Sequence, residues 1–131
     1  MNFGYTTIYV ADVPETVAFY EAAFGIRCRF LHGSNRYAEM DTGDTVLAFA
    51  GNEAARLWDL AVMPNEKGSL PAAWEICFVT DDIERAYERA IDNGCSPVSA
   101  PTLKPWGQKM SYVRDLNGCL VKMITPVPPG D

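Results

Sequence analysis

The chain has 131 residues, of which 48% are hydrophobic, as is typical of one globular domain with a substantial core. Its 17 acidic and 11 basic residues give a net charge of −6, and no Lys/Arg cluster is present. This balance argues against a nucleic-acid-binding surface and would attract a cationic ligand. No apolar run approaches the roughly 20 residues of a membrane span, and the first residues do not resemble a leader peptide. We therefore expect a cytoplasmic protein that does not bind membranes.

The first 25 residues predict a strand that leads directly into a capped helix. Polar and apolar residues alternate over residues 6–10, the period of a half-buried strand. Asp12 is suited to cap the helix that follows, because Pro14 lies in the first turn and Glu15 stands three residues after the cap. Gly25 is suited to end that helix.

Three further strands are predicted after this helix, over residues 26–31, 37–41 and 45–50. Turn residues separate them at 32–36 and 42–44. His32, the only histidine, lies in the first of these turns, and we expect a solvated turn residue there rather than a metal ligand.

The same order of elements begins again about 70 residues later in the sequence. A strand up to residue 79 precedes a helix that Asp82 would cap and Gly94 would end. The prolines that follow limit pairing over residues 95–105 to short pieces or an edge strand. Strands are predicted over residues 109–114 and 119–125, with a tight turn at 115–118 between them. A long period that occurs only twice indicates a duplicated module.

We therefore expect one domain, residues 1–131, made of two modules. The boundaries expected are about 1–51 for the first module, 52–72 for a linker, about 73–125 for the second module and 126–131 for a tail. The linker is expected to contain a short helix from residue 53 to about 59 and to pack its apolar side chains onto the fold. The four cysteines form no Cys-x-x-Cys pair, so free thiols are expected.

Short motifs in this order resemble the glyoxalase/bleomycin resistance/dioxygenase, or vicinal oxygen chelate, superfamily. The motifs are Val10–Asp12, Phe19–Tyr20, Phe24–Gly25, Phe78–Asp82 and Arg114–Gly118. The resemblance implies an α+β fold of two βαβββ modules, whose strands form a curled, mixed to antiparallel, cup-shaped sheet with the helices outside. It also implies a homodimer that binds a small-molecule ligand inside the cup.

Metal-dependent members of that superfamily place a His or Glu ligand on the first and last strand of each module. The matching positions here are Tyr5, Ala48, Glu75 and Lys122. Only Glu75 offers a good donor for a divalent metal, because an alanine has none and an ammonium has no free lone pair. We therefore expect no metal ion and no cofactor.

Strand alternation places other side chains on the same wall as these positions. With the aromatic residues discussed below, the candidates for contacting a ligand are Tyr5, Thr7, Tyr9, Glu75, Cys77, Trp106, Tyr112 and Lys122. Glu75 and Lys122 are expected on neighbouring strands as a partly buried ion pair. The alternative is that both lie in solvent at the rim and contribute little to stability.

Aromatic residues are the other candidates for binding, because flat ligands stack on them and cations lie over indole faces. Trp106 stands between Pro105 and Gly107, a context suited to presenting the ring from a loop, although a tryptophan that closes the end of a core remains the alternative. Trp58 and Tyr112 are further candidates. Glu39 lies on a predicted strand, but alternation does not decide which face it occupies.

The missing metal ligands, the acidic balance and the tryptophans favour a metal-independent binding protein with no catalytic residue. It resembles the bleomycin resistance proteins of the superfamily, and this resemblance implies that it sequesters a planar or cationic compound, such as an antibiotic, in a cup at a dimer interface. The alternative is a lyase, isomerase or dioxygenase of the same fold that uses a metal or acid–base chemistry by Glu75, Tyr5 and Lys122. A third possibility is a degenerate site in a domain that serves only for dimerisation. No phosphate-binding loop or Cys–His pair supports nucleotide or covalent chemistry.

Overall fold

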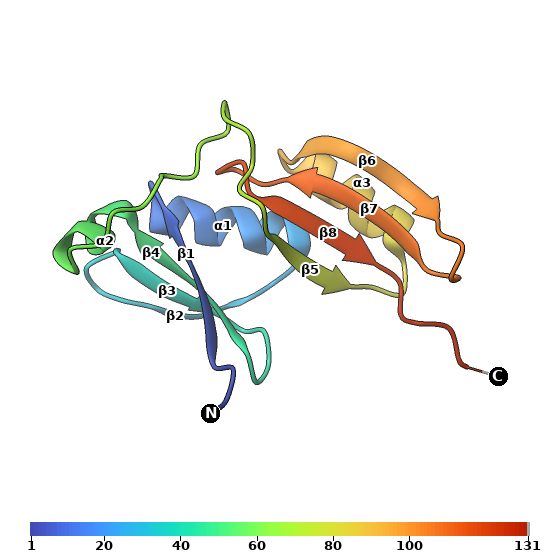
Figure 1. Cartoon of the computed structure of the whole chain (residues 1–131), viewed down its shortest axis with the longest axis horizontal. Coiled ribbons are helices and arrows are strands. Elements are labelled where there is room, and N and C mark those ends of the chain that lie inside the picture. Colours follow the sequence, from blue (N-terminus) through green and yellow to red (C-terminus); the bar gives the residue numbers. More distant parts are fainter. Residues whose placement is uncertain (131) are drawn as a thin grey trace. The chain divides into compact units, whose positions relative to one another are not determined.

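Two four-stranded sheets dominate the computed structural model, which describes residues 1–130 and divides into two units (Figure 1). The N-terminal unit covers Met1–Asn65, and the C-terminal unit begins at Glu66. The N-terminal elements are β1 (Tyr5–Val10), α1 (Val13–Phe24), β2 (Cys28–Leu31), β3 (Tyr37–Met40), β4 (Val46–Gly51) and α2 (Asn52–Leu57). The C-terminal elements are β5 (Glu75–Val79), α3 (Ile83–Asp92), β6 (Ser96–Leu103), β7 (Lys109–Arg114) and β8 (Leu120–Ile124).

Both sheets have the same topology, as expected for a duplicated βαβββ module. The strand order is β1-β4-β3-β2 in one unit and β5-β8-β7-β6 in the other. In each, the first and last strands of the module pair in parallel, and the remaining pairs are antiparallel. This arrangement confirms the predicted α+β class with mixed sheets.

The predicted caps position the helix of each module. The side chain of Asp12 accepts a hydrogen bond of 3.0 Å from the Glu15 amide, and Gly25 ends α1 with a φ of 68°. Asp82 accepts in the same way from the Arg85 amide at 3.2 Å. Both predicted N-caps are therefore confirmed, and each marks the end of its strand and the start of its helix.

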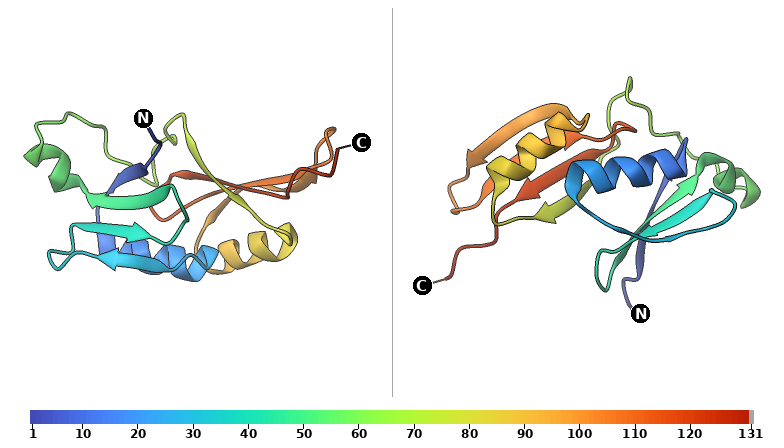
Figure 2. Two further views of the ribbon diagram at one scale, coloured as in Figure 1. Left: turned by 90° about the horizontal axis from the view of Figure 1, so that it is seen from below. Right: turned by 180° about the vertical axis from the view of Figure 1, so that it is seen from behind.

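Each module packs its helix against one face of its own sheet (Figure 2). In the N-terminal unit, the Tyr20 ring of α1 lies 4.9 Å from the Phe49 ring of β4, and both side chains are fully buried. In the C-terminal unit, Ile83 of α3 and Val121 of β8 are buried likewise. We call the opposite face of each sheet, which its own helix leaves uncovered, the open face.

The structure settles one expectation about irregular segments and corrects another. The proline-rich stretch after α3 forms one edge strand, β6, the second of the two arrangements expected, and two register shifts accommodate its prolines. The linker does contain a short helix, α2, but its apolar side chains do not pack: Leu57, Trp58, Leu60 and Val62 are exposed. Leu57 is the last residue of α2, and no regular element follows it to align the other three side chains on one face.

No helix within residues 1–130 is long and apolar enough to cross a membrane.

Candidate ligand-binding site

The open face of the C-terminal sheet carries four of the residues predicted to contact a ligand: Glu75, Cys77, Tyr112 and Lys122. Cys77 of β5 and Tyr112 of β7 both pair with Lys122 of β8, so the three side chains form a row across neighbouring strands. Glu75 lies two residues before Cys77 and therefore projects from the same face. The strand register alone makes these residues neighbours.

Glu75 is the centre of a hydrogen-bonded cluster on this face. Its Oε2 lies 3.0 Å from Lys122 Nζ, and the Tyr112 hydroxyl donates to its Oε1 at 3.4 Å. The Lys122 ammonium also lies 5.5 Å from the centre of the Tyr112 ring. The side chains of Lys122 and Glu75 are 21% and 33% exposed. The predicted ion pair is therefore confirmed, and whether it contributes more to stability than a pair at a solvated rim stays a prediction.

This cluster holds Lys122 as a cation. The hydrogen bond to Glu75 raises the pKa of Lys122 above its ordinary value, with the Tyr112 hydroxyl adding to the shift and partial burial opposing it. Lys122 is therefore protonated at neutral pH and offers N–H donors rather than a nucleophilic amine. Removal of the Cys77 thiol from water raises its pKa, although the residue itself is exposed, so Cys77 carries little thiolate.

The open face of the N-terminal sheet carries Tyr5, Thr7 and Tyr9, as alternation predicted. On β4 they pair with Val46, Ala48 and Ala50, whose side chains are small and buried. Glu39 of β3 pairs with Ala48, so it occupies this face too. The register thereby settles the side of the strand on which Glu39 lies.

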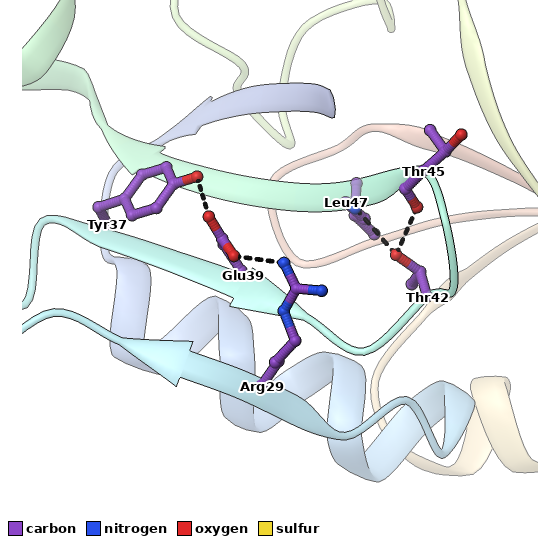
Figure 3. Close-up of polar contacts among 6 residues, drawn as sticks. All are labelled: Arg29, Tyr37, Glu39, Thr42, Thr45 and Leu47. Carbon is purple, nitrogen blue, oxygen red and sulfur yellow. Dashed lines mark hydrogen bonds and ion pairs between the residues drawn. The ribbon is translucent and has the colours of Figure 1, made fainter. Parts of the chain in front are cut away.

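Glu39 forms a second cluster, which the sequence did not reveal (Figure 3). Its Oε1 lies 2.6 Å from Arg29 Nη2, and the Tyr37 hydroxyl donates to its Oε2 at 2.7 Å. The bond from Arg29, followed by the one from Tyr37, lowers the pKa of Glu39, while burial opposes the shift. Burial, with the bond to Glu39, raises the pKa of Tyr37 to about 12. The only signal in the sequence was a carboxylate on a short strand.

Trp106 is presented by a structured loop rather than closing the core of its unit. Its indole N–H donates to Gln108 Oε1 at 2.9 Å, and Gln108 Nε2 donates to the Thr125 carbonyl at 2.9 Å. The residue is nevertheless 59% exposed. Trp58, the other tryptophan considered, is 73% exposed. A role for either ring in binding stays a prediction.

A sequence model of the Glyoxalase/Bleomycin resistance protein/Dioxygenase superfamily matches residues 2–123. The chain belongs to this superfamily. No curated protein sequence matches it.

Solved structures show the same fold at low sequence identity. A glyoxalase-related enzyme from Fulvimarina pelagi has a TM-score of 0.82 at 18% identity, over 99% of this chain and 93% of that one. A glyoxalase/bleomycin resistance protein/dioxygenase family enzyme from Burkholderia phytofirmans PsJN has a TM-score of 0.80 at 22% identity, over 98% and 100%. A glyoxalase/bleomycin resistance protein/dioxygenase from Nocardioides has a TM-score of 0.72 at 18% identity, over 100% and 87%. At identities this low, the similarity shows only that the fold is shared.

The donor atoms at the superfamily's metal positions do not fit a divalent cation. Ala48 has no donor, and Lys122 places an ammonium beside Glu75, the only carboxylate among the four positions. No group of three or more His, Cys, Asp or Glu residues within residues 1–130 is placed to share a metal ion. His32 is exposed in its turn, where its Nδ1 lies 2.8 Å from Ser34 Oγ, as expected of a turn residue.

Proposed function

We propose that the chain binds and sequesters a small planar organic molecule without a metal ion. The observation that carries the proposal is the ion pair between Glu75 and Lys122, at 3.0 Å, on two of the four positions where metal-dependent superfamily members place ligands. A lysine ammonium at such a position repels a divalent cation and occupies the carboxylate that would bind it. The open faces then offer aromatic rings and fixed hydrogen-bonding groups, the usual lining of a site for a small molecule.

Two chemistries of ligand, planar or cationic, were left open by the sequence, and the clusters favour the planar one. Both carboxylate oxygens of Glu75 are engaged, and so are both of Glu39. Each carboxylate also has a protein cation beside it, which would repel a second cation. The net charge of −6 and the exposed tryptophans are the observations that support a cationic ligand.

The proposal includes the assembly and setting that the superfamily resemblance implies. The protein acts as a homodimer in the cytoplasm, and an antibiotic is one example of a compound that it would sequester. Sedimentation equilibrium tests the dimer directly, and a monomer at all concentrations up to that used for ligand binding would remove this part of the proposal.

Metal retention is the first test. The purified protein is incubated with excess Zn²⁺, Mn²⁺, Ni²⁺ or Fe²⁺, desalted and assayed for metal, and retention far below one ion per chain is expected. The variant Lys122→His is the matched control, because it places an imidazole donor beside Glu75 and should retain more Zn²⁺ than the natural chain. Near-stoichiometric metal in the natural chain would overturn the proposal.

Ligand binding is the second test. Titration with planar aromatic compounds should change the tryptophan fluorescence in a saturable way, with Trp106→Phe reducing the signal change. Saturable binding of aliphatic cations, with no binding of neutral planar compounds, would replace the planar ligand by the cationic one.

One arrangement favours a second candidate function, acid–base catalysis on the same face. Glu75, Tyr112 and Lys122 lie in mutual contact, and a protonated lysine beside a carboxylate is able to polarise a carbonyl group while the carboxylate accepts a proton. Recovery of the bound compound distinguishes the two functions. A binding protein returns it unchanged after prolonged incubation, whereas an enzyme returns a product whose formation stops in Lys122→Met.

A further inference from the structure

We infer that Arg29, on the open face of the N-terminal sheet, anchors a carboxylate group of the bound planar molecule. This inference rests on the proposed function, because it names the chemistry of a ligand that the proposal leaves open. The site consists of Arg29, Tyr37, Glu39 and Tyr5, none of which belongs to the cluster around Lys122.

The strand register assembles this site. Tyr37 and Glu39 pair with Ala50 and Ala48 of β4, so both project from the open face beside small side chains. The pairing between β2 and β3 shifts between Cys28 and Phe30, and Arg29 is the extra residue at that bulge. Phe30 is therefore the register partner of Glu39, and the side chain of the neighbouring Arg29 reaches the Glu39 carboxylate (Figure 3).

Glu39 is fixed before any ligand arrives. Arg29 and Tyr37 engage one oxygen each, at 2.6 and 2.7 Å, and the carboxylate side chain is only 16% exposed. A charge-assisted bond to a carboxylate that is itself held by a second donor restricts the guanidinium to one orientation. Arg29 therefore loses little conformational entropy when it binds an acceptor.

Arg29 keeps unused donor capacity. A guanidinium carries several N–H donors in a planar fork, and within residues 1–130 its hydrogen bond to a side chain runs from Nη2 to Glu39. The Arg29 side chain is 45% exposed, so solvent or a ligand can reach it. Such a fork matches the two oxygens of a carboxylate, which it binds in bidentate fashion.

Aromatic side chains on the same open face as Arg29 are the reason to expect the carboxylate on a planar molecule. Tyr9 and Tyr37 flank Ala50 from the two neighbouring strands, and the side chain of Tyr5 is close enough to Arg29 and Tyr37 to interact electrostatically with both. A flat ring has faces to stack on at this site. The Tyr37 hydroxyl already donates to Glu39, so Tyr37 contributes mainly its ring.

The local charge limits the strength of binding. Glu39 neutralises Arg29, and the exposed Asp41 adds negative potential nearby. The directional donors of Arg29, rather than a positive field, must therefore supply the preference for a carboxylate. We therefore expect a preference of only about tenfold for the carboxylate.

Three probes with one ring system and different charges test the inference: 2-naphthoate, the neutral 2-naphthamide and the cationic 2-naphthylmethylammonium. Their dissociation constants are measured by equilibrium dialysis for the natural chain and for variants. We expect 2-naphthoate to bind about tenfold more tightly than 2-naphthamide. Arg29→Met should bring the dissociation constants of 2-naphthoate and 2-naphthamide together, and Arg29→Lys should retain only part of the preference, because an ammonium lacks the planar fork.

Arg36→Met is the matched control, since Arg36 lies in the same unit and pairs with Glu53 at 3.7 Å, with both side chains well exposed. This variant should keep the full preference. A preference that is absent from the natural chain, favours the ammonium, or survives Arg29→Met overturns the inference, while binding of 2-naphthamide still upholds the proposed function. Failure of all three probes to bind counts against both.

Discussion

The ion pair between Glu75 and Lys122 makes a quantitative prediction about stability. A double-mutant cycle with Glu75→Gln, Lys122→Met and the combined variant isolates the interaction between the two side chains. Glutamine keeps an acceptor for the Tyr112 hydroxyl, and methionine keeps most of the apolar stem of the lysine. The cycle therefore removes the two charges with little change in packing.

The geometry limits the coupling energy. Two unit charges 3.0 Å apart attract by about 1.4 kcal/mol at the dielectric constant of water and by about 5.5 kcal/mol at an effective value of about 20. Lys122 and Glu75 are 21% and 33% exposed, so the environment lies between these limits. Desolvation and the ordering of the lysine offset much of the gain. We expect a coupling of about 1–2 kcal/mol, and Lys122→Met alone to cost about 2 kcal/mol.

Urea unfolding, followed by tryptophan fluorescence and far-UV circular dichroism, measures the four free energies, and coincident transitions test two-state behaviour. The pair between Lys109 and Glu84 provides the control. Its separation is shorter, 2.6 Å, but its side chains are 44% and 60% exposed. If burial decides the energy, the control cycle shows no measurable coupling.

Two results would refute this reasoning. Simple additivity at Glu75 and Lys122 would mean that water screens the pair as fully as it screens a surface pair. Equal coupling in both cycles would mean that separation, not burial, governs the energy. Because the folded-state pKa of Lys122 is raised, its contribution should also be constant below the ordinary lysine range and be lost as the pH rises through the raised value.

Three further predictions concern single positions. Gly118→Ala should destabilise by about 2 kcal/mol, since a Cβ at φ +83° would meet the Glu66 carbonyl oxygen at 2.7 Å and the Lys67 Cα at 2.9 Å. Gly43→Ala, at φ +88° in open space, should cost less in urea unfolding. The pKa of Tyr37 is raised from 10.0 to about 12 in the folded chain, so Tyr37 loses its proton more easily in the unfolded chain, and stability should fall between pH 10 and about pH 12. Tyr37→Phe, which also removes the hydrogen bond to Glu39, should make that fall smaller. Ser111→Ala should leave thermal stability unchanged or raise it, because the buried hydroxyl has no hydrogen-bond partner within residues 1–130.

Sequence reasoning reached the cluster around Glu75 because that cluster depends on regular structure. Counting back from the Asp82 cap placed Glu75 at the start of β5, and the duplicated topology placed β8 beside it. Residues on parallel neighbours then share a face by alternation alone. The pairing of β5 with β8 has no register shift, so counting residues along the strands predicted the correct neighbours.

The cluster around Glu39 depends instead on an irregularity. Arg29 reaches Glu39 at a bulge in β2, and the face that Glu39 occupies depends on which side α1 covers. A bulge changes the register without leaving a clear mark on the apolar pattern. Sequence alternation therefore identified two faces of β3 but not the one on which a carboxylate would find its partners.

Local chemistry in the sequence determined the two capped helices, the strands around them and the duplication, because helix caps and periodicity act over a few residues. Only the tertiary structure decided that β6 is one long edge strand despite its prolines, that the apolar residues after α2 stay exposed, and that Arg29 and Tyr37 converge on Glu39. These outcomes depend on which surfaces are available for packing and pairing, and that availability is a property of the folded chain rather than of any segment.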